Sequence, residues 1–191
     1  MQTLQSIDLW LFHALTPWEA PWLDRVMSGI SLIGTASTVW IVIALVALFQ
    51  PNNRMAAWRV YLVVLLCYGV VDAALKPAIA RPRPISVLAF DPPRDLPPMP
   101  RSLSFPSGHT AAAFGSAMAL SRIWPSGRVL WWTLAVLMGY SRIYVGHHYP
   151  LDVAGGALVG VLVAWWVLGG RKVAQNDGAI LKVSPYQPSL E

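Results

Sequence analysis

Charged residues are scarce in this chain: Asp, Glu, Lys and Arg make up 12% of its 191 residues, whereas 55% are hydrophobic. A soluble domain usually carries about 25% charged residues, so the composition excludes an ordinary soluble protein and indicates an integral membrane protein. The net charge of +5 could indicate nucleic-acid binding, but no basic tract or base-stacking motif accompanies it. We therefore expect the lipid bilayer, and no nucleic acid, as a partner.

Cysteine is almost absent as well, because Cys67 is the single one. An intrachain disulfide is therefore impossible, and Cys67 is expected to be a small buried or lipid-facing residue. No H-x-x-x-H pattern or cysteine cluster is present, which disfavours a metal site. The first residues, MQTLQSIDLWLFHAL, also lack the basic leader and the A-x-A-like cleavage site of a signal peptide.

Apolar residues recur at helical spacing in this first segment, at Leu4, Ile7, Leu11 and Leu15. The spacing predicts an amphipathic helix that lies on the bilayer surface. His13 is then a surface residue.

Long apolar segments follow, and about 20 such residues are needed to cross the hydrocarbon core. The expected spans are residues 22–49, 56–75, 107–123, 129–144 and 151–168. The predicted fold class is an all-α, polytopic transmembrane helix bundle of five spans, or six if residues 22–49 are broken near Gly34. Residues 1–170 would form one membrane-embedded domain, and residues 171–191 a flexible tail.

Basic residues predict the orientation of the bundle. In the five-span arrangement one face carries Arg54, Arg59, Arg122, Arg128, Arg171 and Lys172, which marks it as cytoplasmic. The Pro-rich loop 76–106, the start of the helix at residue 107 and the turn 146–150 then share the opposite, periplasmic or extracellular face. That face is basic too, which is an exception to the rule that positive residues gather on the cytoplasmic side. A catalytic purpose for some of these residues would explain the exception.

Ser107 follows Pro106 and precedes a run of small residues, so it is predicted to cap a helix. The N–H groups of Ser107, Gly108 and His109 would be free at that end, where the helix dipole favours an anion. An ordinary capped helix has the same pattern.

His148 and Asp152 are four residues apart, with Pro150 suited to a first helical position. The carboxylate can hold one imidazole N–H and leave the other nitrogen free to attack phosphorus. A metal-ligand role for the histidine is the alternative. Lys76, Arg83 and Arg142 lie near helix ends and can supply cations for phosphoryl oxygens.

Other polar residues receive structural interpretations. Asp72 precedes Lys76 by four residues and is expected to pair with it. His147 is expected to contribute packing or a substrate contact. The arginines of the long loop other than Arg83 are interpreted as headgroup contacts or solvated charges; they are Arg81, Arg94 and Arg101.

Three ordered motifs, KPAIARPRP at 76–84, PSGH at 106–109 and SRIYVGHHYPLD at 141–152, together resemble those of the type 2 phosphatidic acid phosphatase and vanadium haloperoxidase superfamily. The resemblance implies a metal-independent enzyme without a cofactor. It implies that phosphate is bound by Lys76, Arg83, Ser107, Gly108 and Arg142. It also implies His148 as nucleophile, Asp152 as its orienting partner and His109 as general acid.

The chain has no large soluble domain and looks like the bacterial lipid phosphatases of that superfamily, which implies a multi-pass protein of the bacterial inner membrane. The expected reaction is hydrolysis of a lipid phosphate or diphosphate through a phosphohistidine. Undecaprenyl diphosphate, phosphatidylglycerophosphate, phosphatidic acid and lipid A phosphates are the candidate substrates, with selecting contacts expected in residues 88–103. The sequence gives no oligomeric state.

Three alternatives stay open at this point. A lipid phosphotransferase would use the same phosphohistidine on the same scaffold. A vanadate-dependent haloperoxidase shares the anion site, but the apolar spans disfavour it. A non-enzymatic lipid-binding membrane protein is the alternative from another class, although every catalytic position is filled.

Overall fold

The structure is a computed structural model that describes residues 2–16, 20–34, 37–88 and 102–169. Every regular element in these ranges is helical. The predicted tail, Arg94, Arg101 and most of the predicted substrate-selecting segment lie outside them. Cys67 is buried, as expected.

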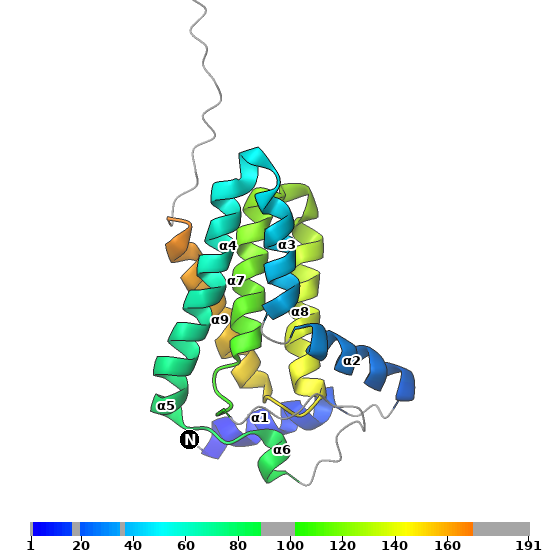
Figure 1. Cartoon of the computed structure of the whole chain (residues 1–191). Helices are drawn as coiled ribbons and strands as arrows, with labels where there is room; N and C mark the ends of the chain where they lie inside the picture. Colours follow the sequence, from blue (N-terminus) through cyan, green and yellow to red (C-terminus); the bar gives the residue numbers. More distant parts are fainter. Residues whose placement is uncertain (1, 17–19, 35–36, 89–101, 170–191) are drawn as a thin grey trace, which may run out of the picture.

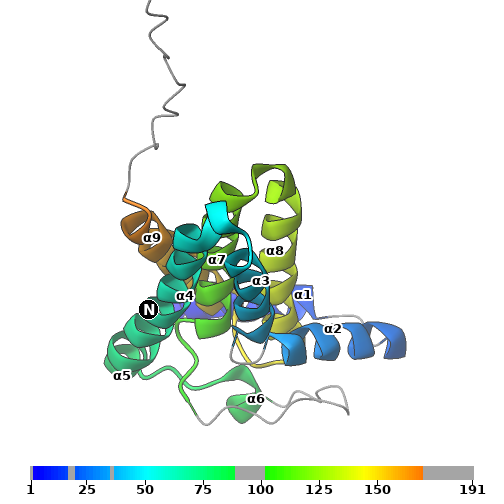
Figure 2. The ribbon, with the colours of Figure 1, turned by 45° about the horizontal axis from the view of Figure 1, so that its top comes forward.

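Five helices stand side by side in the bundle: α3 (Thr38–Leu48), α4 (Arg54–Tyr68), α7 (Gly108–Ile123), α8 (Arg128–Tyr144) and α9 (Pro150–Val167) (Figure 1). Helix α7 is the central element, since it packs against α4, α8 and α9. Short 3-10 turns at Pro51–Asn53 and Pro125–Gly127 precede α4 and α8 at one end of the bundle. Helix α1 (Gln2–Leu15) lies across the other end, and α2 (Pro21–Ile33) projects sideways there (Figure 2).

Small residues let α7 and α9 approach until their backbones touch. A Cβ atom on Gly160 would lie 2.1 Å from the carbonyl oxygen of Ala111, and one on Gly156 would lie 2.4 Å from that of Ser107. A Gly-x-x-x-Gly spacing is a common device for such close helix packing in membranes. The packing aligns the N-terminal ends of both helices, where the backbone N–H of Ser107 donates to the carbonyl of Asp152 over 2.9 Å.

Helix α4 changes character as it approaches the end of the bundle where α1 lies. It continues as a π-helix (Gly69–Leu75), then as α5 (Lys76–Ile79), and it stops at Ala80, whose φ is 52°. After residues 81–83 the chain forms α6 (Pro84–Val87). π-Helical turns are rare and often occur at functional sites. The apolar run 56–75 did not predict this one.

The helix bounds agree with the expected spans to within a few residues, apart from residues 22–49. That region is two helices, α2 and α3, bent by 55° near Gly34, where a break was anticipated. By length and apolarity, two helices of the described residues can cross a membrane, Arg54–Val87 and Pro150–Val167, or three if α2 and α3 form one bent span. Helices α7 and α8, with 16 and 17 residues, are shorter. The count of five or six spans therefore stays a prediction.

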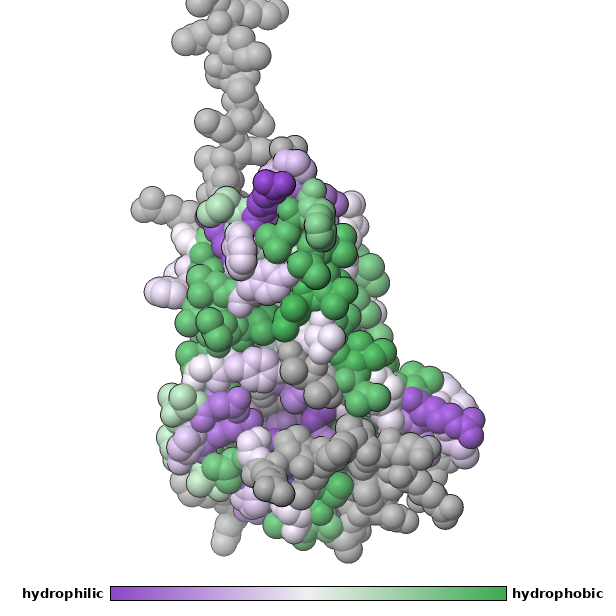
Figure 3. Space-filling model, viewed as in Figure 1, coloured by the Kyte–Doolittle hydropathy of each residue, from purple (hydrophilic) through white to green (hydrophobic). Residues whose placement is uncertain are grey.

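The bundle surface is strongly apolar. Leu65, Leu158 and Trp166 are between 61% and 69% exposed. Figure 3 shows apolar side chains over the middle of the bundle, with hydrophilic ones at the end where α2 projects and at the opposite end. A soluble protein rarely exposes so large an apolar area. The prediction of an integral membrane protein is confirmed.

Helix α1 has two different sides. Ile7, Trp10 and Leu15 are exposed, and so is His13, as expected, whereas Asp8 and Phe12 are fully buried. The side chain of Leu4 lies outside the described residues. The exposed apolar side fits the predicted interfacial helix, and the position of that helix at the bilayer surface stays a prediction. An interfacial helix does not require a buried aspartate such as Asp8.

Candidate active site

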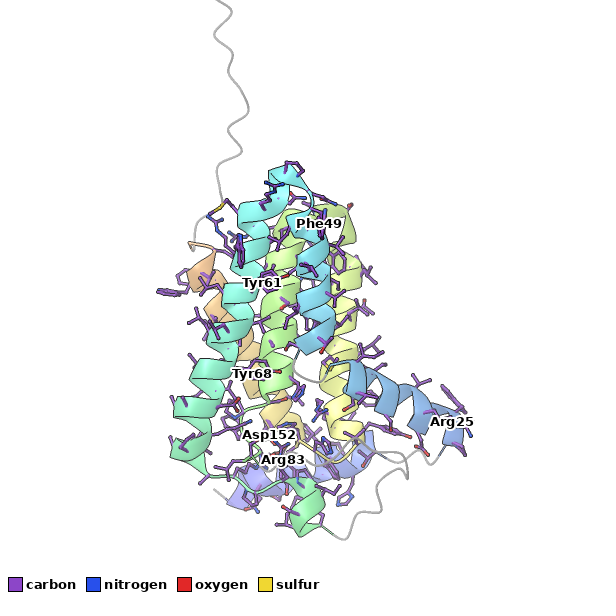
Figure 4. All side chains as sticks on the ribbon, viewed as in Figure 1. Arg25, Phe49, Tyr61, Tyr68, Arg83 and Asp152 are labelled. Atoms are coloured by element: carbon purple, nitrogen blue, oxygen red, sulfur yellow. The ribbon has the colours of Figure 1, made fainter. Side chains whose placement is uncertain are left out.

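A cavity of about 450 Å³ opens beside the N-terminal end of α7. Its lining contains Lys76, Arg83, Gly108 and His109 from the predicted set, together with Tyr68, Asp72, Pro77, Ser102 and Leu103. Figure 4 shows Tyr68, Arg83 and Asp152 at this same end of the bundle. Residues that are far apart in the sequence are thus brought together.

Two buried cations of the cavity wall are held by the same serine. Lys76 Nζ donates to Asp72 Oδ1 over 2.6 Å, which confirms the expected pair, and lies 3.2 Å from Ser102 Oγ. Arg83 donates through Nη2 to Ser102 Oγ over 3.0 Å and through Nε to the Ser102 carbonyl over 2.7 Å. These bonds fix both cations at the cavity wall, and their binding of an anion there stays a prediction.

The third expected cation, Arg142, is 2% exposed and reaches the neighbourhood of His147. Its Nη2 donates to His147 Nδ1 over 2.6 Å, and its Nη1 donates to Ser31 Oγ. Because arginine only donates, Nδ1 must be an acceptor and the proton of His147 resides on Nε2. Burial, reinforced by Arg142 and Arg83, lowers the pKa of His147 to about 3, in agreement with a neutral ring.

The same reasoning assigns the opposite tautomer to His148. Arg83 Nη1 lies 3.0 Å from His148 Nε2 and also donates to the His147 carbonyl over 2.7 Å. Since the guanidinium is a donor only, Nε2 carries a lone pair and the ring proton is on Nδ1. Burial, with Arg83 and Arg142, lowers the pKa of His148 well below its ordinary value. The ring is therefore neutral, with an unprotonated nitrogen beside a cation.

The expected direct hydrogen bond between His148 and Asp152 is not formed, because Nδ1 and Oδ2 are 3.6 Å apart. Ser104 lies beside that carboxylate oxygen: its Oγ is 3.5 Å from Nδ1, about as far as Oδ2 is, and it donates to Asp152 Oδ2. The imidazole N–H therefore faces both the Ser104 hydroxyl and the Asp152 carboxylate, which are bonded to each other. Sequence reasoning missed Ser104, whose only signal is its place just before the PSGH motif.

The interpretation of Arg81 as a headgroup contact or solvated loop charge is wrong. Its Nη1 donates to Asp152 Oδ1 over 2.7 Å and its Nη2 to Asp8 Oδ2 over 2.5 Å. Both carboxylates are fully buried, and a buried carboxylate needs a cation or several donors. In the part of the chain that the structure describes, no group of three or more His, Cys, Asp or Glu side chains is arranged to hold a metal ion.

The N-terminal end of α7 is capped as predicted, since Ser107 Oγ accepts from the Thr110 N–H at 3.4 Å. The expectation of three free N–H groups is wrong for Ser107, because its N–H is bound to the Asp152 carbonyl. The close packing of α7 on α9 brings the Ser107 N–H within hydrogen-bonding distance of the Asp152 carbonyl. His109 lines the cavity, and the Tyr68 ring contacts it edge-on, with 6.3 Å between ring centroids.

Fold and site together define a membrane-embedded helical protein with arginine, lysine and histidine side chains gathered at one end of its bundle. The sequence model of the PAP2 superfamily matches residues 56–174, and the chain belongs to that superfamily. The resemblance drawn from the three motifs is thereby confirmed.

Two curated relatives align over most of their length. The chain is 35% identical over 179 residues to an undecaprenyl-diphosphatase of Sulfolobus acidocaldarius, which covers 91% of this chain and 81% of the relative. It is 31% identical over 182 residues to phosphatidylglycerophosphatase B of Bacillus subtilis, which covers 87% and 84%.

A similar solved structure is the crystal structure of a transmembrane PAP2-type phosphatidylglycerolphosphate phosphatase from Bacillus subtilis. Its TM-score is 0.71 at 28% identity, and the match covers 89% of this chain and 87% of that one. The prediction that the chain is a membrane lipid phosphatase is confirmed by these relatives.

Proposed function

We propose that this protein hydrolyses the phosphate or diphosphate group of a membrane lipid through a covalent phosphohistidine on His148. The observation that carries the proposal is the unprotonated Nε2 of His148, 3.0 Å from Arg83 Nη1. A neutral imidazole nitrogen beside fixed cations suits attack on an anionic phosphoryl group.

Lys76, Arg83 and Arg142 would bind the phosphoryl oxygens, with the hydroxyl of Ser107 and the N–H of Gly108 as further donors. Guanidinium groups offer paired donors to phosphate, and the lysine adds a point charge. Phosphoryl transfer depends mainly on such positioning and charge stabilisation.

In the first step, Nε2 of His148 forms a bond to phosphorus while the bond from phosphorus to the lipid-side oxygen breaks. His109 protonates that oxygen as it leaves. The imidazole becomes cationic, and the Asp152 carboxylate and the Ser104 hydroxyl beside its Nδ1–H stabilise the positive charge. In the second step His109 removes a proton from water, which attacks phosphorus, breaks the N–P bond and releases phosphate.

The active site would face the periplasm or cell exterior of a bacterial inner membrane crossed five or six times. Exposed tryptophans at both ends of the bundle support a bilayer-spanning arrangement: Trp10 and Trp22 lie on α1 and α2 at one end, and Trp58, Trp165 and Trp166 lie on α4 and α9 at the other. Tryptophan gathers at the two membrane interfaces. The 18 residues of α9 span about 27 Å at about 1.5 Å per residue, close to the hydrocarbon thickness.

Undecaprenyl diphosphate is the first substrate candidate, because an outward-facing site suits recycling of a polyprenyl carrier. Phosphatidylglycerophosphate, phosphatidic acid and lipid A phosphates are the other candidates. A phosphate-release screen over these four lipids with purified protein separates them.

The test of the mechanism compares wild type with His148→Ala and His109→Ala in detergent. We expect both variants to stay folded and to lose phosphate release, by at least about 100-fold for His109 as a general acid-base group. Protein quenched in alkaline denaturant, which preserves the N–P bond, should carry labelled phosphate in wild type and none in His148→Ala. His13→Ala, which changes an exposed histidine on α1, serves as the matched control.

Near-wild-type turnover in either active-site variant would overturn the assigned roles. Release of free phosphate without a lipid acceptor favours the hydrolase, whereas an absolute need for an acceptor would favour the phosphotransferase. Lipid binding without turnover of any candidate would favour the non-enzymatic alternative, and halide oxidation with vanadate and peroxide the haloperoxidase.

A further inference from the structure

Asp8 of α1 is a fully buried carboxylate far in sequence from the three motifs. Its Oδ1 accepts from the backbone N–H of Leu151 over 2.9 Å, in the first turn of α9, and its Oδ2 accepts from Arg81 Nη2 over 2.5 Å. A buried charge is costly unless it is paired and hydrogen-bonded. Attachment of α1 to the bilayer surface would not require this residue.

Arg81 connects Asp8 to the proposed catalytic group. One end of its guanidinium donates to Asp8, the other donates to Asp152 Oδ1 over 2.7 Å, and Cζ lies 4.0 Å from the centre of the Tyr149 ring. Two carboxylates and an aromatic face thus fix the orientation of the guanidinium fork. A lysine has a single nitrogen and cannot reproduce both contacts in this geometry.

Asp152 is held through both of its oxygens. Oδ1 accepts from Arg81, while Oδ2 accepts from the Tyr149 N–H over 2.9 Å and from Ser104. Rotation of the carboxylate is therefore blocked, which fixes the position of the Ser104 hydroxyl beside His148. Neither Asp8 nor Arg81 is among the residues that line the cavity.

We propose that Asp8 and Arg81 are positioning residues for phosphoryl transfer, which act on His148 through Asp152 and Ser104. The inference rests on the proposed function of His148 and Asp152. It makes the N-terminal helix a part of the active centre, since α1 supplies the carboxylate that aligns Arg81.

The test measures kcat, KM and thermal stability for Arg81→Gln, Arg81→Lys and Asp8→Asn, and for Arg81→Gln combined with Asp152→Asn. We expect Arg81→Gln to lower kcat by about 10- to 100-fold, on the scale of one lost hydrogen bond to a charged group. KM should stay within about 2-fold, because the cavity-lining cations are intact. Arg81→Lys should recover part of the loss. Asp8→Asn keeps an acceptor for the Leu151 N–H and should lower kcat less than Arg81→Gln.

The double variant separates positioning from mere support of the fold, since residues that act through one another are not additive. In the Asp152→Asn background, Arg81→Gln should lower kcat by less than about 2-fold further. Arg128→Gln, which changes an exposed arginine at the far end of the bundle, is the matched control and should match wild type.

Each remaining outcome contradicts a specific statement. Wild-type kcat in both Arg81→Gln and Asp8→Asn would overturn the inference. The same loss of kcat in both backgrounds, with a matching loss of thermal stability, would reduce Arg81 to an anchor for α1. Wild-type activity of Asp152→Asn would overturn the role of Asp152 and with it this inference, whereas wild-type activity of His148→Ala would overturn the proposed function.

Discussion

Arg83 Nη1 and His148 Nε2 lie 3.0 Å apart, and this contact determines which imidazole nitrogen is free of a proton. The adjacent His147 receives the equivalent contact from Arg142 at its other nitrogen, Nδ1. Two neighbouring histidines are therefore neutral in opposite tautomers. Only His148 places its unprotonated Nε2 beside the arginine that lines the cavity.

Replacement of Ser104 by Ala should lower kcat by about 10- to 100-fold, because a hydrogen bond to a charged group contributes about 1.5–3 kcal/mol. KM should change little, since no phosphate-binding cation is bonded to Ser104. Steady-state phosphate release checks this. Ser121→Ala removes another buried serine, whose Oγ bonds the Ala117 carbonyl within α7, and should leave kcat unchanged. Equal activities of the two variants would show that Asp152 acts without Ser104.

Acidification should destabilise the protein between pH 7 and 5. Burial lowers the pKa of His147 to about 3 and that of His148 well below its ordinary value, whereas both titrate near about 6.5 in an unfolded chain. The unfolded state thus binds more protons below that pH, so stability that is present above about 6.5 is lost as pH falls.

Below the pKa of the unfolded state, each such histidine lowers the free energy of unfolding by about 1.4 kcal/mol per pH unit of acidification. Thermal unfolding in detergent at several pH values measures it. His147→Gln keeps an acceptor for Arg142 and should flatten the dependence by one proton. A melting temperature that is constant over this range would contradict the neutral, buried assignment of both rings.

Vanadate should inhibit competitively with the lipid, because its five-coordinate form resembles the phosphoryl group in transfer. Lys76→Gln removes a cation from the cavity wall and should weaken inhibition by about 10-fold or more, on the scale of a charge-assisted hydrogen bond. Arg128→Gln should leave the inhibition constant unchanged. Chelators should have no effect on turnover. If a chelator abolished activity and a divalent ion restored it, the metal-independent mechanism would be contradicted.

Gly160→Ala should destabilise the bundle, because the new Cβ atom would meet the Ala111 carbonyl oxygen at 2.1 Å. Overpacking of this kind costs about 1–3 kcal/mol, or about 2–4 °C of melting temperature per kcal/mol in a chain of this size. Gly29→Ala is the control, since nothing lies within 4 Å of its Cβ position. Equal melting temperatures would show that α7 and α9 can separate without cost.

The helices were predictable because their signals are local. Apolar runs, the Ser107 cap and Pro150 at the start of α9 mark bounds that the structure reproduces closely. The π-helix Gly69–Leu75 was not predictable, because GVVDAAL also suits an ordinary α-helix. It carries Asp72 to the cavity wall.

The sequence predicted which residues lie at the site better than it predicted the contacts that those residues make. Lys76, Arg83, His109 and Gly108 do line one cavity, as the motifs indicated. The roles of Arg81 and Ser104 depend on partners that are 71 and 48 residues away in the chain. No local pattern encodes such distances.

The sequence by itself determined that this protein is an apolar helical bundle with a phosphate-directed set of cations and histidines, because residue type and helical period are local properties. Only the tertiary structure decided how those groups are held. The close packing of α7 on α9, and the burial of Asp8 from α1 beside Arg81, place Asp152. The contact with Arg83 then determines which nitrogen of His148 is free.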